Sequence, residues 1–269
     1  MLETINQTIS FISRKIKNTP DVGIILGTGL AGLAKEIEVE TILKYEEIPN
    51  FPVSTVEGHH GKLIFGTLGG KKVMAMQGRF HYYEGYAMQQ VTFPVRIMKF
   101  MGIQTLFVSN ASGGINPSFE IGDLMVINDH INLLPNPLIG KHYDEFGPRF
   151  PDMSRTYDLK LIHKAEKIAM TNGIKVQKGC YVGVTGPTLE TPKEYGYFRA
   201  IGGDAVGMST VPEVIVARQM GMSCFAISIV TDLGVPGKIK EVKLEEILKV
   251  AEKSEPKMTL IMKELIQEL

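Results

Sequence analysis

The sequence predicts an α/β fold in which helices flank a central mixed sheet. Short apolar runs, typical of buried strands, alternate along the chain with amphipathic segments that are typical of helices. The chain has 269 residues, of which 44% are hydrophobic, and it contains no internal repeat or low-complexity segment. This length and composition suit one large domain with a largely buried sheet, so we expect residues 1–269 to form a single domain.

The predicted strands share a run of apolar or β-branched residues bounded by Gly, Pro, Asn or Asp. They cover 22–27, 62–77 (a hairpin with Gly69-Gly70 at its tip), 105–110, 123–134, 179–186, 204–209 and 223–230. The predicted helices share apolar residues at helical spacing, and several begin with a capping residue or end at Gly. They cover 2–17, 88–102, 158–172, 191–201, 211–220 and 243–268, and a further helix follows the Gly-rich turn at 27–32.

Charge and cysteine usage argue against several classes of partner. Lys plus Arg and Asp plus Glu both number 29, so the zero net charge gives no indication of nucleic acid or an anionic membrane. The N-terminal residues lack the pattern of a signal peptide, and no apolar run reaches the roughly 20 residues that span a bilayer. Cys180 and Cys224 form neither a CxxC pair nor a disulfide framework. We therefore expect a cytoplasmic protein.

Residues 135–157 interrupt the alternation of strands and helices. The segment PNPLIGKHYDEFGPRFPDMSRTY is rich in prolines and aromatic residues and has no clear periodicity. A stretch of this length in a compact domain is usually functional or part of an interface. Its aromatic content argues against a disordered linker.

A Gly-rich turn, GTGLAG, follows the first predicted strand. Its glycines match the G-x-G-x-x-G pattern of dinucleotide sites, and Glu46 or Glu47 lies about 20 residues on, where such a site places its ribose-binding acid. These glutamates, however, lie in a Pro-rich segment that is typical of a loop. A Gly-rich turn before a helix also suits an anion in general, and Thr28 adds a hydroxyl group to it.

Further strand ends offer polar groups. In MQGRFHYYEGY, Arg79 and His81 combine a guanidinium with an imidazole, which suits a phosphate. In VSNASGGIN, a turn of small and polar residues at 110–114 would let a ligand approach the backbone. In AVGMSTVPEV, Ser209 precedes a helix that has Pro212 in its first turn, where capping is the commoner role for a serine.

Two carboxylates also lie at strand ends. Glu190 precedes a helix that TPKE opens as a capping signature, and Asp232 ends the apolar run of ISIVTDLGVPG. A carboxylate in such a place is either desolvated and functional or turned into water. The adjacent His59 and His60 face opposite ways on an extended chain, and no neighbour completes the spacing of metal ligands, so we expect no metal site.

In their order and spacing, these segments closely resemble the trimeric purine nucleoside phosphorylases. The matching motifs are GTGL, EGHHGKLIFG, MQGRFHYYEGY, VSNASGGIN, GPTLET and DAVGMSTVPEVIVA. The resemblance implies an α/β fold with a partly barrel-like sheet. It also implies that inorganic phosphate, as co-substrate, attacks the anomeric carbon of a purine (deoxy)ribonucleoside to give free base and (deoxy)ribose 1-phosphate. Neither a metal nor an organic cofactor is implied.

The resemblance implies roles for individual residues. Contacts with phosphate are implied for Thr28, His59, Arg79, His81, Asn110, Ala111 and Ser209. Contacts with the nucleoside are implied for Tyr83, Phe150, Leu189, Glu190, Met208, Asp232 and Leu244, and Asn110 is also expected near the base. The expected catalytic residues are Asp232, His81 and Glu190. Phe150 matches an aromatic residue that reaches the neighbouring subunit's site, which implies a homotrimer.

Three positions depart from the family pattern. Asp232 stands where members that use inosine or guanosine have Asn, whereas Asp is usual in the related methylthioadenosine phosphorylases. Leu189 replaces an aromatic residue that contacts the base in many members, and Leu244 replaces a His that contacts the sugar 5′-hydroxyl. Glu190, in contrast, favours 6-oxopurines, because an ionised carboxylate accepts their N1–H.

Two carboxyl groups in one apolar pocket tend to split their pKa values. We expect that, with a 6-oxopurine bound, Glu190 stays ionised while Asp232 carries a proton that it can donate to N7 or O6. The expected main substrates are inosine and guanosine, with more adenosine activity than in a relative with Asn. The alternatives are a methylthioadenosine phosphorylase, an NAD-dependent oxidoreductase and a non-catalytic nucleoside-binding protein.

Overall fold

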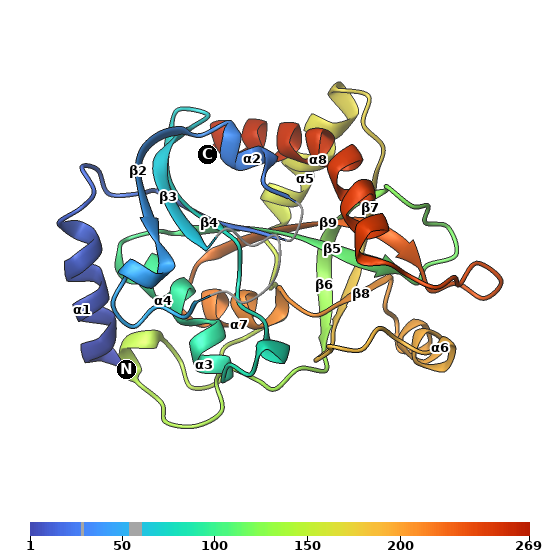
Figure 1. The fold of residues 1–269 in the computed structure, drawn as a ribbon, viewed down its shortest axis with the longest axis horizontal. Helices are drawn as coiled ribbons and strands as arrows, with labels where there is room; N and C mark the ends of the chain where they lie inside the picture. The colour runs from blue at the N-terminus through green and yellow to red at the C-terminus, as the bar shows by residue number, and fades with distance from the viewer. Residues whose placement is uncertain (28–29, 54–60) are drawn as a thin grey trace.

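A mixed sheet forms the centre of the molecule (Figure 1). The computed structural model describes residues 1–27, 30–53 and 61–269, and within these residues nine strands form one sheet. The strands are β1 (Val22–Leu26), β2 (Glu38–Lys44), β3 (Lys62–Leu68), β4 (Lys71–Gln77), β5 (Thr105–Gly114), β6 (Leu124–Asn132), β7 (Val176–Gly183), β8 (Ala205–Gly207) and β9 (Ser223–Leu233). Their order across the sheet is β2-β3-β4-β1-β5-β8-β7-β6-β9.

A second pairing of β5 closes part of this sheet into a barrel. Besides β1 and β8, β5 pairs along its whole length with β9, so that β5, β8, β7, β6 and β9 form a ring. Parallel pairs (β1–β4, β1–β5, β5–β9, β6–β7 and β7–β8) occur together with antiparallel ones (β2–β3, β3–β4, β5–β8 and β6–β9). The predicted mixed, partly barrel-like α/β fold is confirmed.

Helices cover both faces of the sheet (Figure 1). They are α1 (Leu2–Ser13), α2 (Gly32–Lys35), α3 (Met88–Val91), α4 (Phe93–Phe100), α5 (Leu159–Thr171), α6 (Pro192–Ala200), α7 (Val211–Gln219) and α8 (Leu244–Gln267). On one side α8 packs against α2, α5 and β9, and on the other α7 packs against α3, α4 and β9. No helix in the described part of the chain has the length and apolarity needed to cross a membrane.

The central strands follow directly from their apolar sequences. Every residue of β1 is buried, because β1 lies between β4 and β5 and beneath helices on both faces. The hairpin of β3 and β4 has the predicted tip at Gly69-Gly70. In contrast, the sequence did not reveal β2, whose residues EVETILK are mostly exposed at the edge of the sheet. An edge strand buries too little surface to require the apolar pattern by which strands are predicted.

Several predicted elements differ in extent from those observed. The helix expected over 2–17 ends at Ser13, and the strand expected over 179–186 is β7, three residues earlier. The helix expected over 88–102 is two helices, α3 and α4, which meet at Thr92 ahead of Pro94. The expected turn at 110–114 is instead the second half of β5, and β9 runs on past the apolar run to include Asp232. Both strands are extended by the closure of the barrel, because their polar and glycine residues pair with each other and with β8.

The segment 135–157 contains no α-helix or strand, as predicted, and only one short 3-10 turn at Asp144–Phe146. Phe146 and Tyr157 are buried, and the Arg149 side chain donates to the backbone carbonyls of Leu138 and Gly140 at 3.2 and 3.0 Å. These contacts hold the segment against the body of the protein, which agrees with the argument against a disordered linker.

Candidate active site

One cavity of about 360 Å³ collects most of the residues that the sequence pointed to. It lies where the second half of β5 runs between β8 and β9, below the ends of β1 and β4. The predicted residues that line it are Arg79, His81, Tyr83, Asn110, Ala111, Leu189, Glu190, Met208, Ser209, Asp232 and Leu244. Segments more than 160 positions apart in sequence therefore contribute to a single site.

Arg79 is a buried, rigidly held cation in the wall of this cavity. Its Nε and Nη2 donate to the carboxylate oxygens of Glu213 at 3.1 and 3.4 Å, which forms a buried ion pair. Its Nη1 donates to the Ser109 carbonyl at 2.8 Å and to the Ser209 hydroxyl at 3.1 Å. A guanidinium fixed in this way is preorganised to meet an anion.

Ser209 accepts a hydrogen bond from Arg79 and is not the N-cap of α7. The N-cap of α7 is Thr210, which makes no side-chain capping bond and has a φ of 68°. A positive φ is unusual for a β-branched residue, and such strain tends to occur at functional sites. The Thr210 hydroxyl accepts a hydrogen bond from the Asn110 amide at 2.8 Å, so the strained turn joins α7 to β5 at the cavity.

His81 lies beside Arg79, and a carboxylate holds it in place. Its backbone N–H donates to Glu84 at 2.7 Å, and its Nδ1 lies 3.2 Å from the same carboxylate oxygen. The ring stacks on Tyr83 with the centroids 4.7 Å apart. Burial lowers the pKa of His81, and the hydrogen bond to Glu84 opposes this effect. The sequence suggested both His81 and Tyr83, but it gave no reason to choose Glu84.

Asn110 is fixed at the middle of β5. Its side-chain oxygen accepts a hydrogen bond from the Ser228 hydroxyl at 2.6 Å, while its amide donates to Thr210. Ser228 lies on β9 opposite Asn110, and its hydroxyl also pairs with that of Ser112 at 2.6 Å. The side chain of Asn110 is thus oriented by two neighbouring elements.

Glu190 lies just before α6, where the predicted TPKE signature forms a capping box. The Thr191 hydroxyl accepts from the Glu194 backbone N–H, and the Glu194 carboxylate accepts from that of Thr191. Burial raises the pKa of Glu190, the charge of Asp232 raises it further, and hydrogen bonds from its own backbone and from the Tyr195 hydroxyl oppose the rise. Tyr195 is therefore a partner of Glu190 that the sequence did not reveal.

Asp232 lies within β9 and points toward β5. The Thr231 hydroxyl donates to it at 2.9 Å. Opposite it in the register is Gly113, where a β-carbon would lie only 3.0 Å from the Asp232 carboxylate, so a glycine leaves room for this side chain. Burial raises the pKa of Asp232, and the Thr231 hydrogen bond opposes the rise. Asp232 is thus a partly buried and partly desolvated carboxyl group.

Leu189 and Leu244 form an apolar rim. Both are about half exposed, and both line the cavity, Leu244 as the first residue of α8. A second cavity of about 660 Å³ adjoins this rim and shares Leu189, Glu190 and Asp232 with the first. The two carboxyl groups thus line both cavities.

Among the described residues, Phe150 is the one predicted site residue that does not line this cavity. Thr28 and His59 lie outside the described residues. Phe150 is 89% exposed and does not line the cavity of its own chain. This placement removes Phe150 from the site of the single chain.

The Gly-rich turn does not have the surroundings of a dinucleotide site. The Gly32 backbone N–H, at the start of α2, donates to the carboxylate of Glu255 from α8. Glu46 and Glu47 follow the edge strand β2, which pairs with β3, whereas β1 has β4 and β5 as neighbours. In a dinucleotide fold the acid follows a strand next to the Gly-rich strand. The alternative of an NAD-dependent oxidoreductase is therefore wrong.

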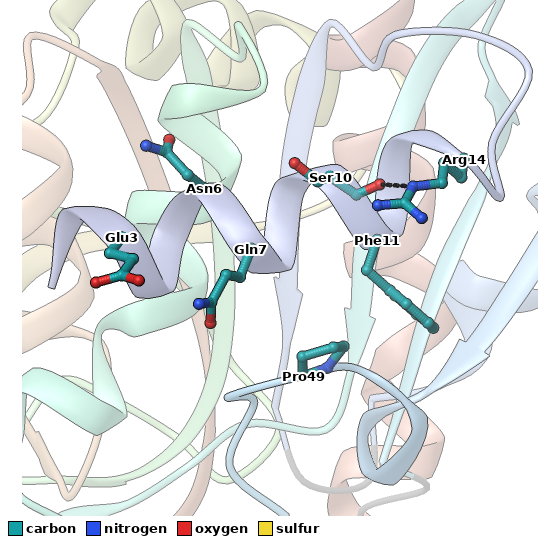
Figure 2. Close-up of a pocket in the computed structure, with 7 residues that line it drawn as sticks. All are labelled: Glu3, Asn6, Gln7, Ser10, Phe11, Arg14 and Pro49. Carbon is teal, nitrogen blue, oxygen red and sulfur yellow. Dashed lines mark hydrogen bonds between the residues drawn. The ribbon is translucent and has the colours of Figure 1, made fainter.

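A further hollow lies on the outer face of α1 (Figure 2). It is lined by Glu3, Asn6, Gln7, Ser10, Phe11, Arg14 and Pro49. Its polar side chains lie along the exposed face of α1, and Arg14, the residue after α1, donates to the Ser10 carbonyl. This hollow has none of the buried, mutually oriented charges that distinguish the cavity at β5.

The residues that sequence analysis missed share one property. Glu84, Tyr195, Glu213, Ser228 and Thr231 contact the predicted site residues and hold them in place. Their sequence signals are weak, because one hydroxyl or carboxylate on a helix or strand looks like any solvated side chain. Glu84, Glu213, Ser228 and Thr231 did lie within stretches that were singled out, so proximity to these stretches was the available signal.

Comparison with known proteins places these features in a family. The family described as Phosphorylase superfamily matches residues 21–267. Purine nucleoside phosphorylase 1 of Bacillus subtilis (strain 168) is 53% identical over 254 residues, which cover 94% of each chain. Purine nucleoside phosphorylase 1 of Geobacillus stearothermophilus is 48% identical over 266 residues, or 98% of this chain and 97% of that one.

A solved structure agrees with the sequence comparison. Purine nucleoside phosphorylase of Schistosoma mansoni in complex with inosine superimposes with a TM-score of 0.94 at 41% identity, covering 100% of this chain and 97% of that one. The chain belongs to the purine nucleoside phosphorylases of the phosphorylase superfamily.

Proposed function

We propose that this protein cleaves the N-glycosidic bond of purine (deoxy)ribonucleosides, with inosine and guanosine as main substrates and inorganic phosphate as nucleophile. The products are free base and (deoxy)ribose 1-phosphate. The observation that carries the proposal is a single cavity with a buried, oriented Arg79 and Ser209 in one part and the two carboxyl groups Glu190 and Asp232 in another. Such a site has one place for an anion and one for a hydrogen-bonding base.

Arg79, Ser209, His81 and the backbone at Ala111 are the proposed phosphate ligands, with Thr28 and His59 from the resemblance. Bond cleavage passes through an oxocarbenium-like sugar that lies between two anions, the phosphate and the departing purine. Catalysis is then a matter of positioning and electrostatics. The ion pair with Glu213 holds Arg79 in position before phosphate arrives, so little reorganisation is needed during the reaction.

Glu190 and Asp232 are the proposed base ligands, with Asn110 beside them. An ionised Glu190 accepts N1–H of a 6-oxopurine. A protonated Asp232 donates to N7 or O6 as negative charge develops on the departing purine. Burial raises the pKa of Asp232, and a raised pKa favours the protonated form that this role requires. Tyr83 and Met208 are proposed to contact the ribose, and Leu189 and Leu244 to border the base and the 5′ position.

The proposal extends to the assembly. The whole chain, residues 1–269, acts as one catalytic domain, and three copies form a homotrimer in which Phe150 completes the site of a neighbour. The exposure of this phenylalanine on the single chain supports a role at an interface. The cytoplasmic location and the need for no metal or organic cofactor stay predictions.

The test is to incubate the purified protein with inosine, with and without inorganic phosphate, and to measure hypoxanthine release. We expect release only with phosphate, and a higher KM for phosphate in Ser209→Ala, because Ser209 is a proposed phosphate ligand and contacts Arg79. Lys167→Ala, at an exposed position on α5, serves as the control and should behave like the parent protein. Release without phosphate would indicate a hydrolase and contradict the proposal.

A second candidate is phosphorolysis of 6-aminopurine nucleosides such as methylthioadenosine. It is favoured by Asp232 and by the apolar Leu244, both of which line the cavity. A panel of inosine, guanosine, adenosine and methylthioadenosine at saturating phosphate distinguishes the two. A higher kcat/KM for methylthioadenosine than for inosine would reverse the ranking.

A further inference from the structure

A cavity smaller than the candidate active site lies apart from it, and the charged side chains that line this cavity are all basic. It measures about 150 Å³ and lies between α3, α4, the end of α7 and the loop over residues 137–149. It shares no lining residue with the candidate active site. Among the described residues its wall contains Arg96, Lys141, Arg149 and His142 but no Asp or Glu.

Arg96 is the buried member of this group. The residue is only 4% exposed, and its Nε has no hydrogen-bond partner among the residues that the structure describes. Its Nη1 reaches the side-chain oxygen of Gln219 at 3.5 Å and the Met220 sulfur at 3.8 Å, both at the limit of a hydrogen bond. The ring of Phe146 covers its guanidinium, with Cζ 3.9 Å from the ring centroid.

Another buried arginine of this protein has an opposite charge beside it. Arg79 forms an ion pair with the buried carboxylate of Glu213. For Arg96, no described carboxylate lies within ion-pair distance. Burial alone lowers its pKa to about 10, so the side chain stays charged at neutral pH. A buried charge without a partner is costly, which means that Arg96 can bind a counter-ion strongly.

The remaining polar groups of the cavity suit the same kind of ligand. Lys141 is exposed at the rim, where its ammonium lies 5.0 Å from the Tyr143 ring. Arg149 is a second cation at the rim, and its Nη1 donates hydrogen bonds to the carbonyls of Leu138 and Gly140. Asp144, three residues after Lys141, pairs with His142, and its fully exposed side chain does not line the cavity.

We propose that this cavity is an accessory binding site for a phosphate-sized oxyanion. Arg96 is its buried ligand, and Lys141 and Arg149 hold the anion from the rim. Planar arginine guanidinium groups recognise such anions through paired N–H donors. The bound anion ties α4 to the loop over residues 137–149, which leads directly into Phe150. The site does not depend on the proposed reaction, because it uses none of that reaction's residues.

The test is equilibrium dialysis of the intact protein against radiolabelled inorganic phosphate. We expect two bound phosphates per chain in the parent protein and one in Arg96→Met, which retains most of the side-chain volume. Lys141→Ala, an exposed substitution that should not affect folding, weakens the second phosphate by about 2- to 5-fold, the usual effect of one partly exposed charge. Lys167→Ala should retain both sites with unchanged affinity.

Two results overturn the proposal. One is a single phosphate per chain in the parent protein at concentrations that saturate both expected sites, which Arg96→Met retains with unchanged affinity. The other is two phosphates with unchanged affinity in Arg96→Met. If a carboxylate from a second copy fills the cavity instead, the parent protein binds one phosphate per chain and Arg96→Met weakens the oligomer in analytical ultracentrifugation. That outcome also rejects the free-anion site.

Discussion

At the scale of single residues, two carboxyl groups in the same cavity respond alike to burial. The pKa values of Glu190 and Asp232 are both raised, and each has one hydroxyl partner that opposes the rise, Tyr195 for Glu190 and Thr231 for Asp232. The charge of Asp232 raises the pKa of Glu190. Burial and the charge of Asp232 both disfavour ionised Glu190, whereas a bound purine that offers N1–H favours it.

The substitution Asp232→Asn tests how this position recognises the base. An ionised Asp232 accepts from the 6-amino group of adenosine, and the neutral amide of the variant would lose that charged hydrogen bond. We expect the ratio of kcat/KM for inosine to that for adenosine to rise by roughly 10-fold, the effect of one hydrogen bond to a charged group. Initial rates with both nucleosides at saturating phosphate measure the ratio. An unchanged ratio would show that Asp232 does not recognise the base.

The substitution Tyr195→Phe tests the control of Glu190. The Tyr195 hydroxyl lowers the pKa of Glu190, so its removal raises that pKa further. The ionised carboxylate, which accepts N1–H, is lost as the pH falls through this pKa. We therefore expect the acidic limb of the pH profile of kcat/KM for inosine to move to higher pH. Tyr197→Phe, at an exposed position on the same helix, should leave the profile in place. A profile unmoved in both variants rejects a role for Tyr195.

At the scale of elements, the site depends on contacts between a helix and strands. Glu213 projects from the first turn of α7, and Arg79 follows the end of β4, so their ion pair joins two layers of the fold. The strained Thr210 at the start of α7 makes a further link to β5 through Asn110. Together these contacts place the N-terminal end of α7 next to the proposed phosphate ligands.

The substitution Glu213→Gln removes the charge that compensates Arg79. A buried arginine without its partner destabilises a fold by about 3–5 kcal/mol, so we expect a loss of this size in the free energy of unfolding. Urea denaturation followed by circular dichroism measures it. As a comparison, Glu166→Gln breaks the surface pair with Lys178 and should cost less than about 1 kcal/mol. Equal effects of the two substitutions would contradict the importance of the buried pair.

At the scale of the whole molecule, Phe150 contacts a substrate site only in the proposed trimer, where it completes the site of a neighbouring subunit. We expect Phe150→Ala to raise the KM for inosine, because the neighbouring site loses this side chain. The residues of the chain's own cavity stay intact, and the protein should remain trimeric. Steady-state kinetics and analytical ultracentrifugation measure the two properties.

Mixing variants sharpens this test. In a trimer with shared sites, a Phe150→Ala chain next to an Asp232→Ala chain regains a complete site. Mixtures refolded from denaturant should therefore recover sites with the parent KM, in an amount that depends on the mixing ratio. If each variant in the mixture keeps its own kinetics, Phe150 does not act across subunits.

Much of the fold could be predicted from the sequence, and so could most of the residues that line the candidate site. The buried run of β1, the hairpin at Gly69-Gly70 and the capping box at Thr191 follow from local patterns. Arg79 and His81 were recognisable because their motif combines groups that suit phosphate. The edge strand β2 was not, because its residues are mostly exposed.

The sequence by itself determined the α/β class, the residues that carry the proposed chemistry and the unusual Asp at position 232. These depend on local patterns and on the identity of side chains. Only the tertiary structure decided that β5 and β9 continue through Gly113 and Asp232, that Glu213 compensates Arg79, and that Arg96 has no such partner among the described residues. The physical reason is that strand closure, desolvation and charge compensation depend on which distant segments meet in the fold, and no local stretch of sequence contains that information.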